Sequence, residues 1–145
     1  MKKSIWFLLT LMISMNVVSA ETDQLYQSGL YAIEKKDFKT AISDFEKVVK
    51  IEPDNSEYYR WLGHAYGLQA EQTSWFKAIG LAKKTRISFE KAVELDPENI
   101  NALVDLREFY KQAPGFLGGG KDKADLITEK LKALGHNVDQ EKESD

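Results

Sequence analysis

Apolar side chains recur at intervals of three and four residues along much of this chain, which is the period of one face of an α-helix. The clearest stripes are Phe38, Ala41, Ile42, Phe45, Val48 and Val49, and then Ala102, Leu103, Leu106, Phe109 and Tyr110. Pro53 and Pro97 each end the helix before them, because proline cannot continue the backbone hydrogen-bond ladder. Asn55 and Asn99 follow two residues later and can cap the next helix. The pattern therefore predicts an all-α protein.

The first twenty residues form a different pattern. Lys2 and Lys3 precede a mostly apolar stretch over residues 5–18, and Val18-Ser19-Ala20 supplies small residues before Glu21. This is typical of a secretory signal peptide cleaved after Ala20. An uncleaved anchor is the alternative, but the stretch is shorter than the roughly 20 apolar residues of a spanning helix. We expect an exported, periplasmic protein, with secretion as the alternative.

An internal repeat lies in the remaining sequence. Residues 45–55 and 89–99 share six identities over eleven positions, and both segments end a predicted helix. Gly29 and Gly63 are also 34 residues apart. A repeat of this period indicates stacked supersecondary units.

The repeated residues resemble those of the tetratricopeptide repeat, a helix–turn–helix unit of about 34 residues. Tyr59-x-x-Leu62-Gly63-x-x-Tyr66 follows the first-helix pattern of that family, and the first repeat has the characteristic residues at the family's spacing. These are Gly29, Ala41, Phe45 and Pro53. The resemblance implies a right-handed stack of about three helix pairs, an α-solenoid.

The resemblance also divides the chain. We expect a signal peptide over 1–20, a repeat domain over 21–135 and a polar, disordered tail over 136–145. The repeats are predicted at about 22–55, at 56–99 with an insertion of about ten residues, and at 100–135 in divergent form. The segment Ala113-Pro114-Gly115-x-x-Gly118-Gly119 is similar to one in a group of exported bacterial tetratricopeptide proteins of unsettled function.

The insertion in the second repeat carries two adjacent aromatic residues, Trp75 and Phe76. One interpretation is that they pack with Leu68 and Leu81 against the lengthened helix. The other is an exposed aromatic ridge that contacts a partner helix or peptide.

The glycine-rich segment from Gly115 to Lys121 has the spacing of a phosphate-binding loop, G-x-x-x-x-G-K. However, Asp122 stands where Ser or Thr would hold Mg²⁺, and a helix rather than a strand precedes the segment. A nucleotide- or anion-binding enzyme is therefore the least favoured function. We expect a tight reversal with Asp122 capping the last helix, and between the two lies a weak anion site at Gly118, Gly119, Gly120 and Lys121.

Catalytic and metal-binding constellations are not predicted. The chain has no cysteine, and its two histidines, His64 and His136, are not at metal-ligand spacing. We expect no enzyme activity, no cofactor and no metal. Removing the leader, which carries two lysines and no acidic residue, changes the net charge from −3 to −5. This balance disfavours nucleic acid and anionic lipid, and we expect no stable membrane insertion once the leader is cleaved.

The predicted function is that of an exported, non-catalytic scaffold that binds a protein or peptide. If the family's face assignment holds, the concave groove is lined by Tyr26, Leu30, Arg60, His64, Glu108 and Lys111. Arg60 would pair with a peptide carboxylate; alternatively, Arg60 is solvated and His64 is half buried in helix packing. The alternative function is an assembly subunit that forms a homodimer through Ile127, Leu131 and Leu134 of its terminal helix.

Overall fold

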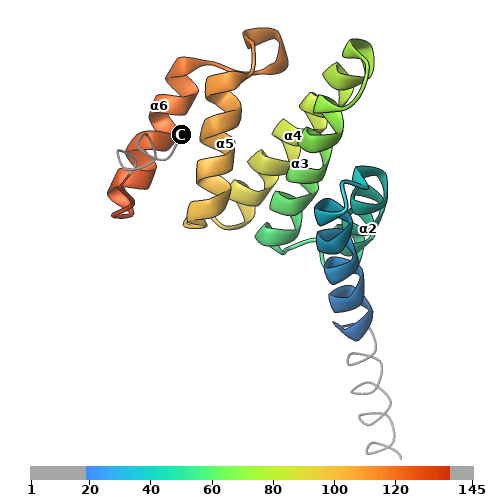
Figure 1. Ribbon diagram of the computed structural model, residues 1–145. Helices are drawn as coiled ribbons and strands as arrows, with labels where there is room; N and C mark the ends of the chain where they lie inside the picture. The colour runs from blue at the N-terminus through green and yellow to red at the C-terminus, as the bar shows by residue number, and fades with distance from the viewer. Residues whose placement is uncertain (1–18, 138–145) are drawn as a thin grey trace, which may run out of the picture. The chain divides into compact units, whose positions relative to one another are not determined.

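The computed structural model describes residues 19–137, and all of its regular elements are helices (Figure 1). The helix over residues 19–34 is followed by these elements: α2 (Phe38–Ile51), α3 (Ser56–Glu71), α4 (Trp75–Leu95), α5 (Ile100–Gln112), the 3-10 helix η1 (Gly115–Leu117) and α6 (Lys121–Ala133). Most of the predicted signal peptide, residues 1–18, and most of the predicted tail, residues 138–145, lie outside this range. None of the described helices is both long and apolar enough to span a membrane. The chain divides after Pro53 into two compact units.

The first unit consists of the helix over residues 19–34 and of α2. Asp37 caps α2 through a hydrogen bond that its carboxylate accepts from the backbone N–H of Thr40. The ring of Phe45 is fully buried, and a Cβ built on Gly29 would lie 2.7 Å from it. Gly29 is therefore what allows the two helices to pack this closely.

The second unit begins with the α3–α4 hairpin, in which the same contact recurs. A Cβ on Gly63 of α3 would lie 2.5 Å from the buried ring of Phe89 in α4. Both predicted asparagine caps are confirmed: Asn55 accepts hydrogen bonds from the start of α3, and Asn99 accepts one at the start of α5. The two glycines therefore recur 34 residues apart because each one makes room for a phenylalanine of the paired helix.

The insertion lengthens this hairpin. The helix α3 continues past Gly67 to Glu71, a short break follows, and α4 runs from Trp75 for 21 residues. The extra residues are thus additional helical turns on both sides of the α3–α4 turn, which lies at the end of the hairpin (Figure 1).

The last helix packs on α5 through the face that was expected to be open. Leu131 is fully buried in a cluster with Leu103, and Ile127 packs against the same cluster. The expectation that Leu131 and Ile127 are available for self-association is therefore wrong, because α6 turns these side chains inward. The exposed apolar residues of this helix region are Leu126 and Leu134.

Candidate functional site

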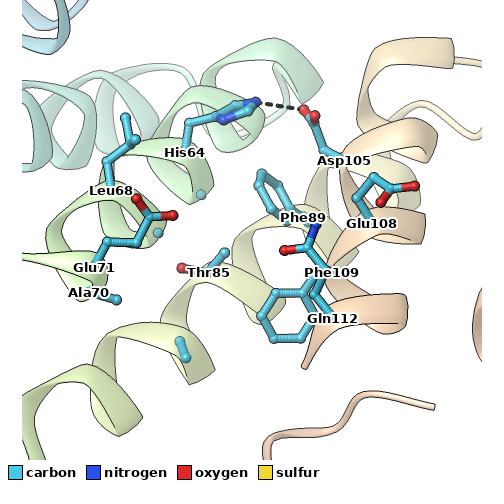
Figure 2. A pocket seen from close by; sticks show the side chains of 13 residues that line it. His64, Leu68, Ala70, Glu71, Thr85, Phe89, Asp105, Glu108, Phe109 and Gln112 are labelled. Atoms are coloured by element: carbon cyan, nitrogen blue, oxygen red, sulfur yellow. Dashed lines mark hydrogen bonds and ion pairs between the residues drawn. The ribbon is translucent and has the colours of Figure 1, made fainter. Parts of the chain in front are cut away.

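A cavity of about 300 Å³ lies between α3, α4 and α5 (Figure 2). It is lined by Gly63, His64, Gly67, Leu68, Ala70, Glu71, Ala82, Thr85, Phe89, Asp105, Glu108, Phe109 and Gln112. Two of the residues predicted for the groove from sequence, His64 and Glu108, are thus brought together at one site. A concave pocket of this size accommodates a few side chains of a bound segment.

Small residues on α3 and α4 create the space. Gly63 and Gly67 lie one turn apart on α3 and face Phe89 and Thr85 of α4. The Thr85 hydroxyl donates to the carbonyl of Leu81, 3.1 Å away, so this polar group is satisfied within its own helix. The base of the pocket is therefore largely apolar, with Phe89 and Phe109 as its bulky members (Figure 2).

Asp105 organises one edge of the pocket. Figure 2 shows His64 of α3 pointing toward Asp105 of α5, and the histidine Nε2 lies 2.8 Å from the carboxylate Oδ2. The Arg60 Nη1 lies 3.1 Å from the same oxygen. Sequence reasoning missed Asp105, although it lies three residues before Glu108 and extending the same helical face by one position would have included it.

Arg60 is held within the chain rather than presented to solvent. Its guanidinium also donates to both carboxylate oxygens of Glu57, and its side chain is only 11% exposed. Burial acts to lower the pKa of Arg60, but the hydrogen bonds and charges of Glu57 and Asp105 raise it above its usual value. Burial likewise opposes ionisation of Glu57, yet Arg60 holds the pKa of that carboxyl below its usual value. The positive charge expected to receive a peptide carboxylate is thus already matched by two acidic residues.

The remaining rim is acidic. Glu108 forms ion pairs with Lys111, at 2.8 Å, and with Arg107, at 3.2 Å. Glu71, on the opposite wall, forms no ion pair or hydrogen bond with its side chain in the described part of the chain. None of the lining residues is lysine or arginine. The unmatched charge of the pocket is therefore negative and lies at Glu71.

The other two predicted groove residues belong to the first unit. Tyr26 is half-buried, and its ring centroid lies 6.0 Å from that of Phe45. Leu30 is also half-buried. Neither residue lines the pocket between α3, α4 and α5.

The two aromatic residues of the insertion are exposed. Trp75 is 65% and Phe76 is 83% accessible, and their rings meet edge to face with centroids 5.3 Å apart. The interpretation that they pack against the lengthened helix is therefore wrong, because both occupy the first turn of α4, beyond the reach of the core.

The glycine-rich turn does not form the predicted anion site. The N–H groups of Gly118, Gly119 and Gly120 donate to the carbonyls of Gly115, Pro114 and Tyr110, respectively. Since these amides are used within the chain, they are not available to a phosphate or carboxylate. Lys121 likewise pairs with Asp125, at 2.6 Å.

The structure gives this turn a packing role instead. Gly118 has a φ of +93° and lies against Arg86, while a Cβ on Gly119 would overlap the carbonyl oxygen of Ala113. Gly120 occupies the N-cap position of α6, and Asp122 lies within the first turn, so the predicted Asp122 cap is wrong. Glycine is required here because the chain reverses closely against its own backbone.

A second polar cluster supports the turn. The Tyr110 hydroxyl donates to Glu90 at 2.8 Å, and Arg86 donates to both oxygens of the same carboxylate at 2.9 Å. Burial, followed by the hydrogen bond to Glu90, raises the pKa of Tyr110 to about 12. Among residues 19–137, no group of three or more histidine, aspartate or glutamate side chains is placed to hold a metal ion.

Comparison with known proteins agrees with this architecture. The family model described as tetratricopeptide repeat matches residues 25–55. The Arabidopsis OM64 TPR domain is similar in structure, with a TM-score of 0.55 and 16% sequence identity over 80% of this chain and 98% of that one. The described residues therefore have the all-helical fold of a tetratricopeptide-repeat α-solenoid, and the predicted fold class is confirmed.

A relative was also found by sequence. Protein CTR9 homolog of Arabidopsis thaliana is 33% identical over 82 residues, which is 55% of this chain. The matched region spans only 7% of the length of that relative. The similarity is thus confined to a short part of a much longer protein.

Proposed function

We propose that this chain is a non-catalytic protein-interaction module that binds a peptide segment in the pocket between α3, α4 and α5. The observation that carries the proposal is the pocket itself: a cavity of about 300 Å³ with an apolar base and a rim of acidic side chains. Stacked helix pairs of this kind offer concave surfaces to partners.

The pocket chemistry defines the bound segment. Phe89 and Phe109 favour an apolar side chain of the partner, because burying that side chain removes apolar surface from water. The unmatched carboxylate of Glu71 favours a lysine or arginine beside it. A terminal carboxylate is disfavoured, since Arg60 is already paired with Glu57 and Asp105.

The test begins with a random peptide library displayed on phage and selected against the immobilised full chain. Enriched peptides are expected to combine a bulky apolar residue with a lysine or arginine. Their affinity is then measured for Glu71→Lys and for Gly67→Leu. The second change fills the pocket from a position where a Cβ meets Thr85 only at 3.7 Å.

We expect Glu71→Lys to weaken binding by roughly tenfold, a loss of about 1.4 kcal/mol. The matched control is Glu94→Lys, which makes the same charge reversal at an exposed residue outside the pocket. Gly67→Leu is expected to abolish binding while helical circular dichroism is unchanged. Peptides that bind both pocket variants as well as the wild type would contradict the proposal.

The cellular location belongs to the same proposal. We place the protein outside the cytoplasm, in the periplasm of a cell with two membranes, because residues 1–20 have the features of a cleavable leader.

A further inference from the structure

The turn between α3 and α4 carries an apolar surface that the pocket does not explain. Trp75 and Phe76 are adjacent, both are largely exposed, and neither lines the pocket. Single exposed apolar residues are normal on protein surfaces. Two large, exposed aromatic rings in contact at the start of α4 form an apolar patch that a partner surface could cover.

The charge around this patch is opposite to that of the whole chain. Residues 72–89 contain three lysines and one arginine and no acidic residue, although the full chain has a net charge of −3. Arg86 is paired with Glu90, and the Lys84 ammonium lies over the ring of Tyr66. Lys77 and Lys83 are exposed and form no ion pair within residues 19–137.

The two unmatched lysines lie close to the aromatic pair along α4. Lys77 follows Phe76 directly, and Lys83 is seven residues from Phe76, so two helical turns bring it back to the same side. Along the sequence, the acidic residues that flank this segment are Glu71, which lines the pocket, and Glu90, which is paired with Arg86. The turn therefore combines apolar rings at its end with positive charge just behind them.

This combination fits a bilayer surface better than a protein surface. Protein interfaces are enriched in aromatic residues but depleted of lysine, and their most important side chains fill pockets of the partner. At membrane surfaces, by contrast, tryptophan and phenylalanine lie at the headgroup level while lysines contact anionic lipid. We propose that the α3–α4 turn is a peripheral contact with an anionic bilayer, in which Trp75 and Phe76 enter the headgroup region and Lys77 and Lys83 lie against lipid phosphates.

The net charge of the chain does not oppose this contact. At an ionic strength of 0.1 M, charges more than about 10 Å from a surface are largely screened. The attraction to the bilayer therefore depends on the positive charge near the turn and not on the net charge of the chain. The contact uses residues other than those that line the pocket, and Glu71 of the pocket wall directly precedes Gln72 of the turn. It also differs from membrane insertion, since none of the described helices can span a bilayer.

The absence of cysteine permits a position-specific test with the full chain. Gln72→Cys places an environment-sensitive fluorophore in the turn, and Glu94→Cys places it near the other end of α4, roughly 30 Å away along the helix. Each labelled protein is mixed with phosphatidylcholine vesicles, with or without phosphatidylglycerol. We expect a blue shift of the label at position 72 with the anionic vesicles and no shift of the label at position 94.

Two double variants of the Gln72→Cys protein identify the contributing groups. Trp75→Ser with Phe76→Ser removes the rings, and Lys77→Glu with Lys83→Glu reverses the charge; all four side chains are exposed, so circular dichroism should not change. Each double variant is expected to weaken vesicle binding by roughly tenfold or more. For the charge reversal, the reason is that each lysine at an anionic surface contributes about a factor of five. For the ring removal, the reason is the loss of the aromatic side chains that enter the headgroup region.

Three results would overturn the proposal. The first is no shift at position 72 with either vesicle, which would leave the aromatic pair to a protein partner. The second is an equal shift at positions 72 and 94, which would assign the binding to another segment such as residues 1–20. The third is an equal shift with neutral and anionic vesicles, which would remove the role of Lys77 and Lys83.

Discussion

Replacing Gly63 by alanine tests the packing on which the pocket depends. The new methyl group would lie 2.5 Å from Phe89, whose ring is buried and cannot move away without disturbing its neighbours. Overpacking of this kind destabilises the folded state by about 1–3 kcal/mol, while replacing glycine by alanine within a helix stabilises it by about 0.5–1 kcal/mol. We therefore expect Gly63→Ala to lower the free energy of unfolding by about 1 kcal/mol.

Gly67 provides the matched control one turn later in the same helix. A Cβ there meets Thr85 at 3.7 Å, which is ordinary van der Waals contact. Gly67→Ala should therefore raise the free energy of unfolding by about 0.5–1 kcal/mol, because it gains helix propensity without a clash. The two variants should differ by about 2 kcal/mol, although both make the same chemical change.

Thermal unfolding followed by circular dichroism measures this difference. Both glycines belong to the second unit, which begins at Asp54 and is described as far as residue 137. For a unit of that size, 1 kcal/mol corresponds to a change in Tm of about 4–8 °C. The double variant Gly63→Ala with Phe89→Leu should recover part of the loss, because the smaller side chain makes room for the methyl group. Equal Tm changes for Gly63→Ala and Gly67→Ala would refute the reasoning, since they would show that the Phe89 ring yields at no cost.

Three further predictions concern other parts of the chain. Asp105→Asn should lower the free energy of unfolding by about 1–3 kcal/mol, because it removes the carboxylate that Arg60 and His64 share, whereas the exposed control Asp125→Asn should cost less than about 0.5 kcal/mol in the same urea titration; equal costs would contradict the role of Asp105. Burial and the hydrogen bond to Glu90 raise the pKa of Tyr110 to about 12 in the folded state, above its ordinary value of 10.0, so the stability that this group contributes should be fully present below about pH 10 and should be lost as the pH rises toward 12. Tyr110→Phe should remove that part of the pH dependence, and an unchanged alkaline profile would argue against it. Mass spectrometry of the native protein should find Glu21 at its N-terminus, and a chain that retains residues 1–20 would contradict the predicted cleavage.

The repeat spacing predicted the packing of the helices well, for a physical reason. Gly29 and Gly63 recur at 34 residues because each faces a phenylalanine of the paired helix, so the steric requirement is visible in the sequence itself. The starts of α3 and α5 could also be predicted from the sequence, because Asn55 and Asn99 cap the helices that follow the two prolines.

Other features depend on contacts between distant segments and could not be read from local patterns. The helix α6 has apolar residues on more than one side, and only its packing on α5 decides that Leu131 is buried while Leu126 is 71% exposed. The role of Asp105 likewise depends on α3 and α5 lying side by side, which places its carboxylate between Arg60 and His64. The glycine-rich turn resembled an anion site because its sequence does not show that its amides donate to nearby carbonyls.

The central claim is that a peptide binds in the pocket between α3, α4 and α5. Its most direct test is the change in backbone amide chemical shifts when a selected peptide is added to the isotopically labelled full chain. We expect the chemical-shift changes to concentrate at pocket residues such as Leu68, Phe89 and Phe109. Changes confined to residues 22–53, or to the turn around Trp75, would contradict it.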